Sequence, residues 1–189
     1  MQLDCELFIE NYNITFLEDW NKCSWPITIN NVISEEWIIK NTEYLEKWKH
    51  TRFPYYPLLK TTVKGKLGEI LVTEYMRNNG FKVSGRKNTG HDRIIDDIKT
   101  EIKISIRLKT EFICNHISLD KDWERLIFLG INAETDEYFP YFITKDNFRN
   151  NIGQFNHQQG GITVKNDDYM LLTKPPNVLS FFQKINEWK

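Results

Sequence analysis

The sequence predicts an α/β fold in which a central mixed β-sheet is flanked by helices, with a small helical N-terminal subdomain attached. Residues 98–108 alternate between apolar and polar side chains, which is the period of a β-strand with one face in a core. Residues 126–131 form a continuous apolar run, which is typical of a strand buried on both faces. Residues 63–80 carry apolar side chains at helical spacing, so a helix is expected to precede the strands.

Residues 1–55 are expected to form the helical subdomain, and residues 56–189 the core. Helical spacing occurs at 35–40 and 44–48 in the N-terminal part. The same part contains Trp20, Trp25, Trp37 and Trp48. These tryptophans are interpreted either as core residues or as a dimer surface.

The helix expected at 63–80 has its apolar stripe at Leu67, Ile70, Leu71 and Tyr75. Gly80 is expected to end it. Gly65 and Gly68 would allow the start of the helix to approach the sheet or a phosphate closely, because glycine has no Cβ atom.

A β-hairpin is expected after the polar, basic loop at 81–91. The pair Asp96-Asp97 lies between the short run 93–95 and the alternating segment 98–108, and such a pair favours a tight turn. Further strands are expected at 112–117, 138–144 and 169–172, and a closing amphipathic helix at 178–185. Pro140 requires an edge or bulge position in its strand, because it lacks a backbone N–H group.

Composition limits the functional classes. The chain has 189 residues and a formal net charge of -1, so it is one domain or a core with a small appendage. The near-neutral charge argues against a protein that coats nucleic acid nonspecifically. The three cysteines, Cys5, Cys23 and Cys114, are too few and too widely spaced for a disulfide framework or a zinc site. We therefore expect a reducing, cytoplasmic setting, in which Cys114 is a buried small residue. A transmembrane helix is not expected.

The hairpin carries the strongest candidate site. Glu101 and Lys103 project from the same face of the expected strand, about 6.5–7 Å apart. The turn folds the chain back and places Asp92 beside Glu101. Two carboxylates with the Ile102 carbonyl would make a hard oxygen site that suits Mg²⁺. Lys103 would orient or deprotonate an attacking water and offset charge in the transition state.

Other readings of these residues remain open. The Glu101-Lys103 pair is also compatible with an amphipathic strand whose second face carries alternating charges. Glu69 lies off the apolar stripe of its helix, and is either a surface glutamate or a further acid of the site.

The combination resembles the PD-(D/E)XK nuclease superfamily, which has the restriction-endonuclease-like fold. The resemblance spans about residues 64 to 131 and rests on Gly65 to Glu69 in the helix, Asp92 in the hairpin, and Glu101-Ile102-Lys103. It implies that Asp92 and Glu101 bind metal, that Lys103 serves the attacking water, and that Glu69 is a further acid near the metal. His91 stands where many members have proline.

The resemblance implies a Mg²⁺-dependent, site-specific endonuclease for double-stranded DNA, of the type II restriction kind, that leaves 5′-phosphates. Mn²⁺ is expected to substitute for Mg²⁺, and Ca²⁺ to support binding without cleavage. A homodimer would match a palindromic site, and a DNA methyltransferase acting on the same site is an expected partner. The alternatives are a structure-specific nuclease (a Holliday junction resolvase or repair nuclease), a binding module with a decayed site, and a nuclease of low sequence preference.

Candidate DNA contacts surround the site in sequence. Basic and polar residues expected near phosphates are Lys64, Lys66, Arg86, Lys87, Ser105, Arg107, Asn115 and His116. A glycine-flanked loop at 150–161 supplies Asn156, His157, Gln158 and Gln159, and such side chains can bond base edges. The alternative for both groups is an ordinary polar surface.

Overall fold

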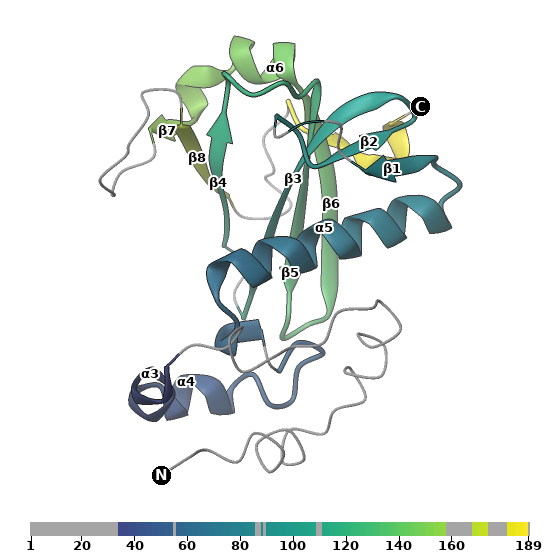
Figure 1. The fold of residues 1–189 in the computed structure, drawn as a ribbon. Helices are drawn as coiled ribbons and strands as arrows, with labels where there is room; N and C mark the ends of the chain where they lie inside the picture. Colours follow the sequence, from purple (N-terminus) through teal and green to yellow (C-terminus); the bar gives the residue numbers. More distant parts are fainter. Residues whose placement is uncertain are drawn as a thin grey trace.

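The computed structural model of the chain describes residues 34–54, 56–85, 88, 90–108, 111–157, 168–173 and 181–188. Within them, a six-stranded sheet has the order β1-β2-β3-β5-β6-β9 (Figure 1). Its strands are β1 (Val83–Gly85), β2 (Arg93–Ile95), β3 (Ile98–Arg107), β5 (Arg125–Asn132), β6 (Glu137–Thr144) and β9 (Gln183–Lys184). β3 pairs with β5 in parallel and the other neighbours are antiparallel, so the predicted mixed sheet is confirmed.

Helices and a second sheet complete the fold. The second sheet has the order β4-β8-β7, with β4 at Phe112–Ser118, β8 at Asp168–Thr173 and β7 at Asn156–His157. The α-helices are α3 (Glu35–Lys40), α4 (Thr42–Glu46), α5 (Thr61–Asn78) and α6 (Lys145–Asn150). Short 3₁₀ turns are η2 (Tyr56–Leu58), η3 (Ile152–Gln154) and η4 (Ile185–Glu187). The predicted strands at 112–117, 126–131, 138–144 and 169–172 are therefore present.

The long helix α5 crosses one face of the main sheet, but the predicted stripe on it is partly wrong. Of that stripe only Leu67 is buried, and Tyr75 is 40% exposed. The cause is Gly68: a Cβ atom there would lie 2.3 Å from the Cγ2 atom of Ile104, so the helix meets the sheet at this glycine. The line of contact continues one and two turns later through Val72 and Met76. A count of apolar side chains overlooks a glycine at the point of closest approach.

Gly80 ends the helix region as predicted. Its φ of 80° is left-handed, which glycine adopts without strain. Its N–H donates to the Arg77 carbonyl at 2.9 Å, and the Phe81 N–H donates to the Met76 carbonyl at 3.0 Å. This pair of bonds is a Schellman motif, which satisfies the last carbonyl groups of α5.

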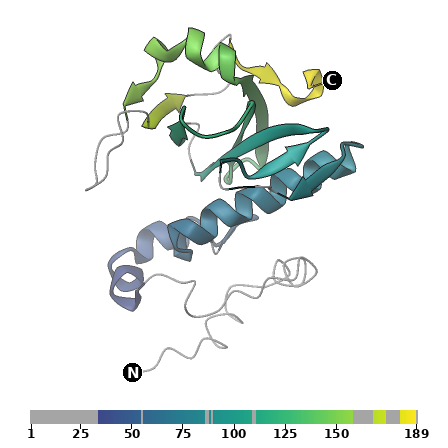
Figure 2. The same cartoon turned by 45° about the horizontal axis from the view of Figure 1, so that its top comes forward.

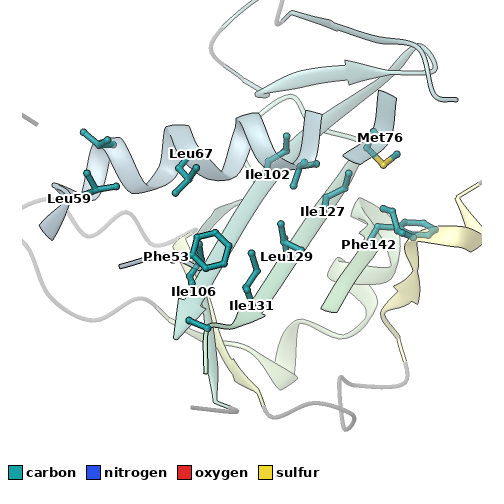
Figure 3. Packing of buried hydrophobic residues seen from close by; sticks show 14 of the residues in the cluster. Phe53, Leu59, Leu67, Met76, Ile102, Ile106, Ile127, Leu129, Ile131 and Phe142 are labelled. Atoms are coloured by element: carbon teal, nitrogen blue, oxygen red, sulfur yellow. The ribbon is translucent and has the colours of Figure 1, made fainter. Parts of the chain in front are cut away.

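Both faces of the sheet centre are covered. Ile102 and Ile106 of β3 and Ile127, Leu129 and Ile131 of β5 point toward α5 (Figure 3). Leu126 and Phe128 of β5 point the other way, into a second apolar cluster with Phe112, Trp123 and Phe148. β5 is therefore buried on both faces, as its composition predicted.

The predicted closing helix is wrong over the described residues. Residues 178–180 lie outside them, and the chain then forms β9 rather than a helix. Gln183 pairs with Phe142 and Lys184 with Tyr141, on the edge of β6. This pairing satisfies backbone groups while burying Phe182, Ile185 and Trp188. Pairing with a distant edge has overridden the local periodicity. Pro140 lies one residue outside the β6–β9 pairing, where an N–H group is not required.

The helices α3 and α4 lie beside the start of α5 (Figure 2). Trp48 and Phe53, which follow them, are buried in the same core as α5 and β3, whereas Trp37 is 37% exposed. The division of the chain at residue 55 stays a prediction. Trp20, Trp25, Cys5 and Cys23 lie outside the described residues. No helix in the described ranges combines the length and apolar character needed to cross a membrane.

Candidate functional site

The hairpin between β2 and β3 sets the register of the site. Asp96 and Asp97 have φ angles of 47° and 65°, and positive values at both positions are those of a type I′ turn. Ile95 then pairs with Ile98, and Arg93 with Thr100. The Asp92 N–H extends the ladder by donating to the Thr100 carbonyl at 3.0 Å. Asp92 is consequently placed opposite Glu101, as predicted.

The Asp92 carboxylate is held by the backbone of the neighbouring strand. Its Oδ2 accepts a hydrogen bond from the Ile102 N–H at 2.8 Å. Burial raises the pKa of Asp92, and the negative charges of Glu101 and, more weakly, Glu69 raise it further. The Ile102 N–H and the charge of Lys103 act in the opposite direction. A bound cation would relieve the repulsion between these close carboxylates.

Glu101 is the most enclosed acid of the site, with its side chain 1% exposed. Its Oε1 atom accepts hydrogen bonds from Lys103 Nζ and Lys121 Nζ, each at 2.8 Å. Its Oε2 atom is buried and has no hydrogen-bond partner within the described part of the chain. A buried carboxylate oxygen without a partner is energetically costly unless something else binds it.

Glu69 lies near Asp92 but is already paired. Its Oε2 atom contacts Lys66 Nζ at 2.7 Å and an Arg93 guanidinium nitrogen at 2.8 Å. Arg93 also donates to the Asp92 carbonyl at 2.7 Å and to the Thr73 hydroxyl at 3.1 Å. Arg93 therefore connects α5 to the hairpin and holds Glu69 beside the other two acids.

The residues fit a cation only through a mixed donor set. Across the described ranges, no three His, Cys, Asp or Glu side chains are grouped closely enough to hold a metal ion. Asp92 and Glu101 supply two carboxylates. Strand residues present their N–H and C=O groups to the same neighbour, so the Ile102 carbonyl faces the edge where its N–H binds Asp92. Among the described residues, Glu101 Oε2 is a buried carboxylate oxygen without a partner, and it is therefore available to a cation.

A groove of about 1170 Å³ begins beside Lys103 and runs along β3. Its lining is Tyr44, Lys47, Tyr56, Thr61, Lys64, Gly65, Ile102, Lys103, Ile104, Ser105, Ile106, Arg107, Leu108, Ile113, Asn115, His116 and Glu134. Four of these carry lysine or arginine charges and only Glu134 is acidic. Partial burial lowers the pKa of Lys64, whose Nζ atom lies 5.1 Å from the Tyr56 ring centre. The groove is thus a positively charged channel that opens next to the paired acids.

A bulge in β4 shapes one wall of the groove. The pairing of β4 with β8 shifts between Cys114 and Ile117, and His116 has a left-handed φ of 54°. Bulges redirect side chains beside functional sites, and here Asn115 and His116 both line the groove. Cys114 is fully buried, as predicted, and burial raises the pKa of its thiol to about 12.

Most of the predicted DNA contacts that the structure describes are brought together. Lys64, Ser105, Arg107, Asn115 and His116 line the groove. The Ser105 hydroxyl is engaged, because it accepts a hydrogen bond from the Ile113 N–H at 3.1 Å. Lys66 pairs with Glu69 instead of lining the groove.

The structure describes only part of the predicted base-reading loop, so its role stays a prediction. Asn156 and His157 form β7, which pairs with β8, and Asn156 does not line the groove. Arg86, Lys87, Gln158 and Gln159 lie outside the described residues.

Sequence reasoning missed Lys121 and Lys47 as members of the site. Lys121 lies in an irregular segment where no periodicity indicates a direction. Lys47 lies in a segment of helical spacing, but no local pattern indicates that it lies beside the groove. Arg93 is one of the basic residues that cluster in sequence around the site and could contact phosphates, but its pairing with Glu69 could not be predicted from that cluster.

The chain has a weak structural likeness to an endonuclease of known structure. No family model matches the sequence, and no curated protein matches it. Among solved structures, a bacterial homing endonuclease, I-Ssp6803I, is similar with a TM-score of 0.40 and 13% identity. The match covers 61% of this chain and 75% of that one. The likeness is too distant to assign a function.

Proposed function

We propose that this chain is a metal-dependent DNA endonuclease that hydrolyses phosphodiester bonds by attack of water. The observation that supports this proposal is the half-buried Asp92 beside the buried Glu101, whose Oε1 atom binds Lys103 and whose Oε2 atom has no partner among the described residues. Two acids and a lysine at the mouth of a positively charged groove are what cleavage of a polyanion requires: charge neutralisation, a positioned water and phosphate contacts.

Mg²⁺ is the proposed cofactor. Asp92 and Glu101 would hold the ion, with the Ile102 carbonyl and waters completing an oxygen shell of the kind that Mg²⁺ prefers. When bound, such an ion lowers the pKa of a coordinated water and neutralises charge on the phosphate. Lys103 would orient the attacking water from the same strand face, and Glu69, fixed by Arg93, would add negative charge beside the pair without itself being a ligand.

The groove is the proposed binding site for the nucleic acid. Arg107, Lys64 and Lys47 supply positive charges along it, and phosphate contacts of this kind provide affinity without sequence information. Asn115 and His116 on the bulge of β4 are the groove residues able to contact bases or sugars. The finer proposal is a type II, site-specific enzyme that acts as a homodimer on double-stranded DNA.

The deciding experiment is digestion of a long, unmethylated DNA of known sequence by the purified chain in Mg²⁺, with EDTA as the control. Discrete and reproducible bands would support the site-specific enzyme, and a metal-dependent smear would support a nuclease of low preference. A parallel digestion of a four-way junction and a flap tests the structure-specific alternative. Failure to cut any of these DNAs in Mg²⁺ or Mn²⁺ would contradict the nuclease proposal.

A further inference from the structure

The second lysine on Glu101, Lys121, is not part of the sequence motif. Its Nζ atom lies 2.8 Å from Glu101 Oε1, which is the same oxygen that Lys103 contacts. Glu101 comes from β3, whereas Lys121 follows β4 and lies 20 residues later in the chain. Two ammonium groups thus share one oxygen of a carboxylate whose other oxygen has no partner within the described residues.

The loop that carries Lys121 is anchored independently of Glu101. Lys145 Nζ donates to the Lys121 carbonyl at 2.5 Å. The indole N–H of Trp123 donates to the Ser118 carbonyl at 2.7 Å, and Trp123 itself is buried. The fold therefore delivers the Lys121 backbone to this place, and the contact with Glu101 is not required to hold the loop.

The two lysines differ in freedom. The Lys103 side chain is 16% exposed, and that of Lys121 is 37% exposed. Lys103 is fixed on a central strand, whereas Lys121 reaches Glu101 from the solvent side on a flexible four-carbon chain. Lys121 is consequently the cation that can leave Glu101 without disturbing the sheet.

We propose that Lys121 is a placeholder cation: it balances and orients Glu101 before a divalent ion binds, and then turns to a phosphate of the bound nucleic acid. This proposal rests on the proposed function for its second half. The first half concerns only the protein and a metal ion. Lys121 competes with the ion for the charge of Glu101, so its removal strengthens metal binding while weakening cleavage. Loss of a purely structural ion pair would not strengthen metal binding.

The test is Mn²⁺ binding to the full chain without DNA, followed by electron paramagnetic resonance of the free ion. The variants are Lys121→Met, Lys121→Arg and, as the matched control, Lys99→Met. Lys99 pairs with Asp122 in the same loop and does not contact Glu101. We expect the Mn²⁺ Kd of Lys121→Met to fall roughly threefold to tenfold, because one competing charge is removed at a partly exposed position. Lys121→Arg and Lys99→Met should keep the wild-type value.

Cleavage at saturating Mn²⁺ is the second readout. Lys121→Met is expected to lower kcat about tenfold or more through the lost phosphate contact, and Lys121→Arg to restore most of it. An unchanged or weaker Mn²⁺ affinity in Lys121→Met would overturn the proposal, as would a wild-type chain that binds no Mn²⁺. If Mn²⁺ affinity rises as expected but no DNA is cut, the placeholder role stands and the proposed nuclease function fails.

Discussion

The two faces of β3 make opposite use of the same ten residues. The even-numbered residues of β3 form one face, called the even face, and the odd-numbered residues form the odd face. On the even face, Ile102 and Ile106 pack under α5 in a continuous apolar core. On the odd face, Glu101 and Ser105 are equally enclosed, but every polar atom there needs a partner from another element. Apolar burial is satisfied by any well-shaped neighbour, whereas polar burial is satisfied only by specific donors and acceptors.

The even face of β3 therefore contributes mainly to stability, and the odd face carries the candidate site. On the even face, Ile102, Ile104 and Ile106 have no polar side-chain atoms, so this part of the face can be judged by packing alone. On the odd face, Glu101 Oε2 has no hydrogen-bond partner among the described residues, and the neighbouring Asp92 has a raised pKa, so this face combines burial with uncompensated charge. Variants that touch one face should therefore leave the property of the other face nearly unchanged.

The largest expected effect is on cleavage, from the odd face. Glu101→Ala and Lys103→Ala should each lower the cleavage rate by at least roughly 10²-fold, because the proposed metal ligand or the proposed water-positioning group is lost. DNA binding in Ca²⁺ should persist, as measured by fluorescence anisotropy. Near-wild-type cutting by both variants would remove these residues from the mechanism.

The even face is tested by a matched pair of glycines in α5. Gly68→Ala should lower the free energy of unfolding by about 1–3 kcal/mol, because the new methyl group would collide with Ile104. Gly65→Ala has open space around its Cβ position and should stabilise the helix by up to about 1 kcal/mol. Urea unfolding measures both. Equal effects at the two positions would show that Gly68 does not mark the close approach.

A smaller effect is expected where the odd face is purely structural. Ser105→Ala removes the acceptor for the Ile113 N–H, and should cost about 1 kcal/mol in urea unfolding. Ser84→Ala, on an exposed position of β1, is the control and should be neutral. Loss of cleavage in Ser105→Ala without loss of stability would instead indicate a direct contact with DNA.

The smallest effect concerns the pH dependence of stability. The raised pKa of Asp92 means that the folded state favours its protonated form, so wild-type stability falls as pH rises through that pKa. Asp92→Asn cannot ionise, so in metal-free buffer its thermal midpoint should exceed the wild-type one at neutral pH. The difference should shrink in acid. Mg²⁺ should stabilise the wild type but not the variant, and a variant that is less stable at neutral pH would contradict the sign of the shift.

The sequence predicted those parts of the fold that local periodicity controls. The hairpin acids were predicted because a two-residue turn and an alternating strand fix which side chains lie side by side. β5 was predicted from its continuous apolar run, and the presence of α5 from the helical spacing of its apolar side chains.

The remaining features depend on contacts between distant elements. The stripe on α5 was misplaced because Gly68 gives no hydrophobic signal, and β9 was mistaken for a helix because only the free edge of β6 favours a strand there. Lys121 could not be assigned because its direction depends on Lys145 and Trp123, which hold its loop.

The Asp96-Asp97 turn fixes one hairpin register, and this register determines both the core and the candidate site. If the hairpin slipped by one residue, Glu101 and Lys103 would point under α5, and Ile102 and Ile104 would leave the core, because neighbouring strand residues point to opposite sides. Such a chain would lose its core and its acids together. The candidate site therefore forms only in the register that also builds the core.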